Sequence, residues 1–167
     1  MFKLVIALFA LSGMIVFAAT NETVSRALNI TRPDVKVQIS GVVQRNDQTL
    51  SVEKVEAVNS GEILDWKISS VNEGNASAEN YRVVGQIPEG TSFVAGTARS
   101  EQKGSVTYSI DGGKEFSAQP LIDEKQADGS VKKVPAPVSM YTHLKFEWSA
   151  PLGVKEKLDA SYRVRVK

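Results

Sequence analysis

Apolar and polar residues alternate along most of the chain from residue 35 onward. In one run, Leu144, Phe146 and Trp148 are separated by Lys145 and Glu147. Successive side chains of a strand point to opposite faces, so such a run has one buried and one exposed face. This pattern is typical of antiparallel sheets covered on one side. We expect strands at about residues 35–43, 49–57, 62–71, 79–87, 91–97, 105–110, 142–149 and 157–166, with a weaker one near 115–122.

Turn-forming residues separate these runs. Gly, Asn and Asp supply the positive φ angles that tight turns require. The turn signals are Asn46-Asp47, Asn59-Ser60-Gly61, residues 72–75, Pro88-Glu89-Gly90, Asp111-Gly112-Gly113, Asp128-Gly129 and Pro151-Leu152-Gly153. No long stretch has a helical period. The predicted fold class is therefore all-β, an antiparallel β-sandwich of about seven to nine strands in two stacked sheets.

The amino terminus has the layout of a secretory signal peptide. Residues 1–3 carry one positive charge, residues 4–17 are almost wholly apolar, and cleavage is favoured before Ala19. An uncleaved anchor is the alternative, but the apolar run is shorter than the roughly 20 residues that a spanning helix needs. We expect a signal peptide (1–18), a polar lead segment (19–34) and one domain (35–167), in the periplasm, on the cell surface or secreted.

Composition narrows the classes of partner. The chain has 167 residues and no cysteine, so it folds without disulfides, as bacterial surface modules do more often than small animal secreted domains. Removal of the signal peptide, which contains Lys3, would leave 19 basic and 19 acidic residues. This balance gives no reason to expect nucleic acid or anionic lipid as a partner. We also expect no transmembrane span after signal cleavage and no cofactor.

Five motifs, in this order and spacing, resemble one bacterial family. They are Gly61-Glu62-Ile63-Leu64-Asp65-Trp66, Val71-Asn72-Glu73-Gly74, Ile87-Pro88-Glu89-Gly90-Thr91, residues 108–116 (YSIDGGKEF) and residues 142–148 (THLKFEW). Together they resemble the repeat domain known as domain of unknown function 11. The resemblance implies an immunoglobulin-like β-sandwich in an exported or surface protein, and it implies no reaction. Gly85 and Gln86 stand near the place where family members often have Asp, and the chain holds a single copy of the repeat.

Several residues of these motifs are expected to build turns. Asn72 is predicted to hydrogen-bond backbone groups across its turn, as Asn does in Asx-turns, with a ligand role as the alternative. Gly74, Pro88 and Gly90 are the other turn residues of this part of the chain.

The segment Ser109-x-Asp111-x-Gly113-x-x-Phe116 also resembles the Asp-box hairpin of secreted β proteins. That resemblance implies an Asp carboxylate that accepts backbone N–H bonds and an aromatic ring packed beneath it. We expect Asp111 and Gly113 to be structural. A calcium or glycan contact is the alternative.

Residues 117–141 form the longest insertion between predicted strands. A solvated hairpin turning at Asp128-Gly129 is one interpretation, and a recognition loop is the other, because loops on rigid scaffolds often carry binding. The acidic spacing does not fit a calcium-binding EF-hand loop. The candidate binding residues are Asp123, Glu124, Asp128, Lys132 and Lys133.

The remaining candidates for chemistry are weak. His143 is the sole histidine, its place in the alternation points it outward, and zinc sites need several clustered ligands. Trp66, Trp148, Tyr108 and Tyr162 alternate with polar residues, so we expect them in the core rather than on a sugar-binding platform.

Together these features predict a non-enzymatic envelope or extracellular module that binds or scaffolds other surface components. Its expected partners are envelope proteins or surface glycans, and its expected mechanism is loop presentation or strand addition at a sheet edge. A carbohydrate-binding accessory domain is the alternative. No catalytic residue, cofactor site or metal site is predicted.

Overall fold

The computed structural model of the protein describes residues 31–167, and Arg32–Lys167 form one compact unit. The predicted signal peptide (1–18) and the lead segment up to residue 30 lie outside the described residues. Within residues 31–167, no helix is long and apolar enough to cross a membrane.

Strands form most of the described chain. They are β1 (Val35–Arg45), β2 (Gln48–Ser51), β3 (Ile63–Asn72), β4 (Arg82–Gln86), β5 (Thr91–Phe93), β6 (Arg99–Ser100), β7 (Gly104–Ser109), β8 (Leu121–Lys125), β9 (Val131–Pro135), β10 (His143–Trp148) and β11 (Lys157–Val166). Two single 3₁₀ turns, η1 (Val52–Lys54) and η2 (Val138–Met140), are the helical elements of residues 31–167.

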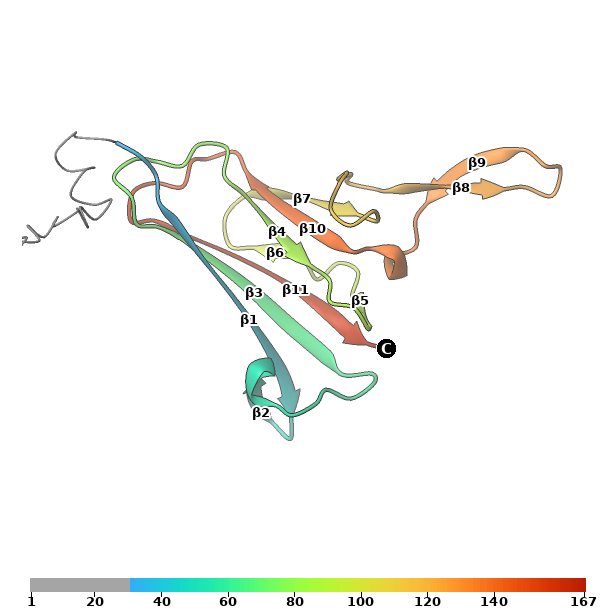
Figure 1. Cartoon of the computed structure of the whole chain (residues 1–167), viewed down its shortest axis with the longest axis horizontal. Coiled ribbons are helices and arrows are strands. Elements are labelled where there is room, and N and C mark those ends of the chain that lie inside the picture. Colours follow the sequence, from blue (N-terminus) through green and yellow to red (C-terminus); the bar gives the residue numbers. More distant parts are fainter. Residues whose placement is uncertain (1–30) are drawn as a thin grey trace, which may run out of the picture. The chain divides into compact units, whose positions relative to one another are not determined.

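The strands form two sheets and a separate hairpin (Figure 1). The large sheet has six strands in the order β2-β1-β3-β11-β5, with β6 also paired to β11. The small sheet has three strands in the order β4-β10-β7, and β8 pairs with β9 alone. All of these pairs are antiparallel. The predicted all-β sandwich is confirmed.

Residues 31–167 contain eleven strands, where seven to nine were predicted, and several predicted strands differ from those in the structure. The strand expected at 91–97 ends at Phe93, and β6 and β9 were not predicted. The strand expected at 49–57 ends at Ser51, where η1 begins. Its apolar residues Val52, Val55 and Val58 are spaced by three rather than two, and they pack against the core from an irregular segment. The weak strand expected near 115–122 is replaced by β8, which begins only at Leu121 after the turn that follows β7.

The core lies between the two sheets. The inner face of β10 contributes Leu144, Phe146 and Trp148, each at most 4% exposed. The large sheet faces them with residues of β3 and β11 that include Leu64, Ile68, Tyr162 and Val164. Alternation therefore selects one face of each strand, and burial of these faces against each other stabilises the sandwich by roughly 25 cal/mol per Å² of apolar surface.

The small sheet covers only part of the large one. A β-carbon at Gly85 in β4 would lie 2.8 Å from the Tyr162 ring and 3.2 Å from Ile68, so β4 lies over β3 and β11. At the other side, the Tyr108 ring of β7 lies 5.4 Å from the ring of Phe93 in β5, measured between centroids. Since β4 is the outermost strand of the small sheet, β1 and β2 extend beyond its cover.

Candidate functional site

Asn72 is fully buried and connects three segments of the chain. Its Oδ1 accepts N–H bonds from Asp34 (3.2 Å) and Gly74 (3.1 Å), and its Nδ2 donates to the carbonyls of Ala76 (2.7 Å) and Leu152 (3.0 Å). These bonds use both donors and both acceptor positions of the amide. The side chain thereby joins the entry to β1, the turn after β3 and the loop before β11.

Gly74 allows the entry segment to approach the turn closely. A β-carbon at this position would lie 2.4 Å from the backbone nitrogen of Asp34 and 2.5 Å from the carbonyl oxygen of Arg32. The absence of a side chain lets these backbones meet. Gly74 thus serves contact between segments, since its φ angle is not among the positive ones.

The turn before β5 contains Pro88 and Gly90. Both the N–H and the hydroxyl of Thr91 donate to the Pro88 carbonyl, at 3.1 and 2.7 Å. Gly90 has a φ of +77°, which favours glycine, and its carbonyl accepts the Lys167 N–H at 2.8 Å. This turn therefore holds the end of β11.

Asp111 organises the turn after β7. Its Oδ1 accepts the Ser109 hydroxyl (2.6 Å) and the N–H groups of Lys114 and Glu115 (both 3.1 Å). The hydrogen bond from Ser109, and then that from the Glu115 backbone, lower the pKa of the Asp111 carboxyl. Ser109 in turn accepts the N–H of Gly113 at 2.9 Å.

The aromatic residue of this turn lies beside a small hollow. Phe116 and Tyr108 line a space of about 270 Å³ next to Asp111, and the Lys145 ammonium lies 5.0 Å from the centre of the Phe116 ring. Within residues 31–167, no group of three or more His, Cys, Asp or Glu side chains is placed to hold a metal ion.

The insertion 117–141 contains the β8–β9 hairpin, which turns at residues 126–130. Asp128 accepts both the N–H and the hydroxyl of Ser130, at 2.9 and 2.6 Å. Lys133 forms an exposed ion pair with Asp123 at 3.0 Å, and Lys132 lies opposite Glu124. Charges of opposite sign thus face each other across the hairpin, and the predicted binding residues form a mixed, solvated surface rather than a patch of one sign.

The aromatic residues lie in or against the core. Trp148 and Tyr162 are 4% and 2% exposed, and Trp66 and Tyr108 are partly buried against the same cluster. His143 is half-buried beside Gly113, with its Nδ1 3.2 Å from the Thr142 hydroxyl. Within residues 31–167, Trp66, Tyr108, Trp148 and Tyr162 therefore form no row of exposed rings on which a sugar could stack.

Strand β4 has an unpaired edge. Within residues 31–167 it pairs with β10 alone. The backbone N–H of Trp148 donates to the Tyr81 carbonyl (3.2 Å), and the backbone N–H of Ile87 donates to the Thr142 carbonyl (2.8 Å). In an antiparallel ladder, hydrogen-bonded residues alternate with residues whose backbone groups point the other way. The odd-numbered residues 81–87 therefore bond to β10.

The even-numbered residues present their backbone groups at the free edge. Arg82, Val84 and Gln86 direct their N–H and C=O groups away from β10. The Gln86 carbonyl accepts the Tyr162 hydroxyl there at 2.5 Å. Burial raises the pKa of Tyr162 to about 12. The groups of Arg82 and Val84 remain a template for another strand.

Two exposed apolar side chains of the large sheet belong to β1, one strand beyond the β3 residues that β4 covers. Val37 and Ile39 pair with Ser70 and Ile68 of β3, so they occupy the inner face of the sheet. Ser70 and Ile68 are at most 1% exposed, whereas Val37 and Ile39 are both 48% exposed. We call the free edge of β4, together with Val37 and Ile39, the open-edge surface.

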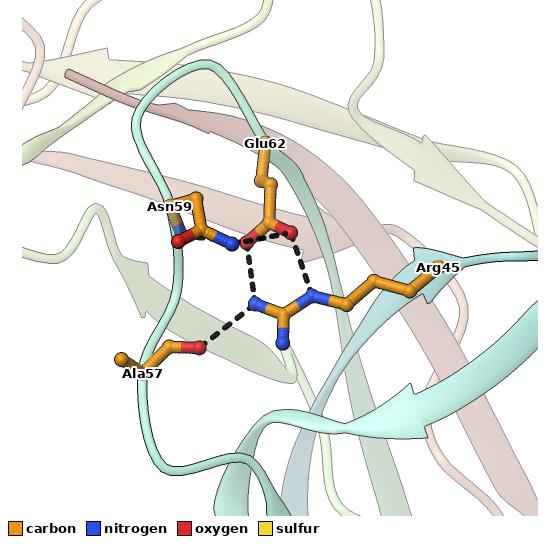
Figure 2. Close-up of polar contacts among 4 residues, drawn as sticks. All are labelled: Arg45, Ala57, Asn59 and Glu62. Carbon is orange, nitrogen blue, oxygen red and sulfur yellow. Dashed lines mark hydrogen bonds and ion pairs between the residues drawn. The ribbon is translucent and has the colours of Figure 1, made fainter.

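An ion pair closes the far end of β1 (Figure 2). Arg45 Nε and Nη2 donate to the two carboxylate oxygens of Glu62, at 2.6 and 2.8 Å, and Nη2 also donates to the Ala57 carbonyl at 2.8 Å. The Asn59 N–H adds a bond of 2.7 Å to Glu62. The Arg45 bond first, and then the Asn59 bond, lower the pKa of Glu62 to about 2.

This ion pair fixes the segment between β2 and β3. Val52, Val55 and Val58 of that segment pack against the cluster that contains Val43, which is 1% exposed. The open-edge surface is therefore bounded at one end by this segment and at the other by the Asn72 hydrogen bonds. Sequence reasoning did not find this surface, because alternation in β1 predicts an inner face and carries no signal that the face lacks cover.

No family model, curated protein or solved structure matches this chain. The resemblance to domain of unknown function 11 stays a prediction.

Proposed function

We propose that this chain is a non-enzymatic exported module that scaffolds other surface components by accepting a strand at its open-edge surface. The observation that supports this is the coincidence of an unpaired strand edge, β4, with the exposed apolar side chains of Val37 and Ile39. Strand addition takes its affinity from main-chain hydrogen bonds and its specificity from alternate side chains, and this surface offers both.

The chemistry of the surface favours a peptide over a sugar. Natural sheets usually protect an edge with charge, proline, a bulge or a covering loop. Here Val84 at the centre of the edge is itself 42% exposed, and its N–H and C=O point outward. A bound strand would satisfy these backbone groups and cover Val37 and Ile39 in one step.

The test is crosslinking in the native cells, followed by fractionation and affinity purification. A Val84→Pro variant removes an outward N–H while leaving the bonds from β4 to β10 in place, and proline is tolerated at such edge positions. We expect a stoichiometric protein partner in the exported fraction, reduced at least tenfold by Val84→Pro. A Val131→Lys variant, altered on the exposed hairpin where Val131 is 63% exposed, serves as the control.

Three outcomes would contradict the proposal. The first is residence of the chain in the cytoplasm. The second is a protein partner whose recovery is the same with Val84→Pro. The third is recovery of polysaccharide without protein, which would instead support the carbohydrate-binding alternative.

A further inference from the structure

We propose a phosphate-binding site on the outer face of the large sheet, where β6 lies beside β11. The site is a hollow of about 210 Å³ that Arg99, Ser161 and Arg163 line. Val37 and Ile39 lie on the inner face of the same sheet. The hollow is therefore separate from the open-edge surface, and the inference goes beyond the proposed function.

The register of the large sheet brings the three side chains together. Arg99 lies directly opposite Ser161 in the pairing of β6 with β11, and Arg163 follows Ser161 on the same face, two residues along β11. Diagonal neighbours of this kind have β-carbons roughly 7–8 Å apart, within reach of long side chains. The Thr97 hydroxyl accepts the backbone N–H of Arg163 at 3.1 Å, so the segment that leads to Arg99 also lies beside Arg163.

Both guanidinium groups are held in place by bonds within the protein. Arg99 Nη1 donates to the carbonyls of Gly96 and Ala98, at 2.6 and 3.0 Å. Arg163 Nε donates to the Asp65 carboxylate. Each group keeps further N–H donors, because a guanidinium has several. Donors that are already fixed lose little conformational entropy when they bind an anion.

The hollow has a surplus of positive charge. Asp65 also lines it and neutralises Arg163, but Arg99 forms no ion pair with any residue of 31–167. The Ser161 hydroxyl has no hydrogen-bond partner in this part of the chain. Like charges that meet on a sheet destabilise it. An anion between the two guanidinium groups would relieve their mutual repulsion and accept a bond from Ser161.

A neighbouring hollow is less suited to an anion. It has a volume of about 160 Å³ and shares Arg99 and Ser161, but the carboxylates of Asp159 and Glu101 also line it. Two carboxylates would repel a bound anion. The site is therefore the hollow that contains Arg163.

The donor groups favour a phosphate group over a carboxylate. A phosphate monoester carries roughly 1.5 to 2 negative charges at pH 7 and has three acceptor oxygens. A carboxylate carries one charge on two oxygens. Two guanidinium groups and one hydroxyl surround the hollow, so of these two anions the phosphate alone has an oxygen for each. The planar fork of arginine also matches the geometry of phosphate oxygens.

The experiment is a titration of the full chain, labelled with ¹⁵N, with inorganic phosphate. The backbone amide resonances and the arginine Nε–H resonances report binding. We expect saturable shifts of the resonances of Arg99, Ser161 and Arg163. Acetate at the same ionic strength should give small shifts that do not saturate.

Four variants of the full chain test the assignment, with circular dichroism as the check that each is folded. Arg99→Gln should weaken phosphate binding by roughly tenfold or more, since it removes a charge-assisted donor. Arg99→Lys should bind with intermediate affinity, because it keeps the charge and loses the fork. Ser161→Ala removes only a hydroxyl and should weaken binding by about threefold. Lys132→Gln, which removes a positive charge from the exposed β8–β9 hairpin, is the control and should bind like the wild type.

Three results would overturn the inference. One is the absence of saturable binding by the wild type. Another is phosphate binding that neither Arg99→Gln nor Ser161→Ala weakens. The third is a set of shifts that acetate reproduces at the same ionic strength.

A second titration, with a hexose monophosphate, identifies the source of the phosphate group. Binding as tight as that of inorganic phosphate would support a phosphate carried on a surface component. Much weaker binding would support the free ion. These readouts do not involve the β4 edge, so their failure would leave the proposed strand addition standing, and a partner that does not depend on Val84 would leave the phosphate site standing.

Discussion

Strands β10 and β1 have the same pattern of alternation but different surroundings. Leu144, Phe146 and Trp148 of β10 are at most 4% exposed, whereas Val37 and Ile39 of β1 are both 48% exposed. Both sets lie on the inner face of their sheet. The difference arises because the large sheet has six strands and the small sheet three, so β1 extends beyond its cover. Alternation therefore identifies the inner face of a strand, and the width of the opposite sheet decides whether that face is buried.

The largest change in stability is expected when one inner-face side chain of β10 and one of β1 are each replaced by alanine. Phe146→Ala should lower the free energy of unfolding by about 3–5 kcal/mol, because it removes a fully buried ring and leaves a cavity. Ile39→Ala should cost less than about 1.5 kcal/mol in the monomer, since half of that side chain already contacts solvent. Urea unfolding of monomeric protein measures both. Equal losses would mean that β1 is covered as well as β10.

A smaller change in stability is expected for a substitution in β4, the outermost strand of the small sheet. Gly85→Ala should destabilise the fold by about 1–3 kcal/mol, because the new methyl group would lie 2.8 Å from the Tyr162 ring and push β4 outward. Val84→Ala, on the opposite face of the same strand, is the control and should change stability by less than about 1 kcal/mol. Thermal unfolding followed by circular dichroism compares the two. A neutral Gly85→Ala would contradict the placement of β4 against β11.

The smallest change in stability is expected from loss of the Arg45–Glu62 ion pair, which lies at the end of β1. The pKa of Glu62 is lowered from 4.5 to about 2, so its bonds to Arg45 and Asn59 stabilise the folded state above pH 4.5. That contribution should decline as the pH falls from 4.5 to about 2. Glu62→Gln should therefore be less stable than the wild type at pH 7, and the difference should shrink across this window.

The comparison with Glu62→Gln is needed because the pKa of a second carboxylate, Asp159, is also lowered to about 2. Burial acts to raise the pKa of Asp159, but hydrogen bonds from Lys67 and Lys157 outweigh it and bring the pKa to about 2. Urea unfolding at several pH values, for both proteins, isolates the share of Glu62. A difference that stays constant down to pH 2 would contradict the role of the ion pair.

The sequence predicted the local features of this protein well, because they depend on residues close together in the chain. Strand positions followed from alternation, and the Asp111 turn followed from the turn residues Asp111-Gly112-Gly113 and from the resemblance to the Asp-box hairpin, whose bonded groups lie within one turn. The hairpin turning near Asp128-Gly129 had the same basis. Where the spacing of apolar residues changed from two to three, at 52–58, the strand prediction failed for the same local reason.

The tertiary structure alone decided which strands became neighbours, and so which surfaces stayed open. Nothing in the sequence near Asn72 indicates that its amide will bond to Leu152, 80 residues away. Nor does the alternation of β1 indicate that the small sheet ends at β4 and has no further strand to cover β1. Strand order depends on contacts between distant segments, and these are set by packing of the whole core. The sequence thus determined the fold class and the face that each strand turns inward, and the folded chain determined that β4 has a free edge and that Val37 and Ile39, one strand beyond its cover, stay exposed.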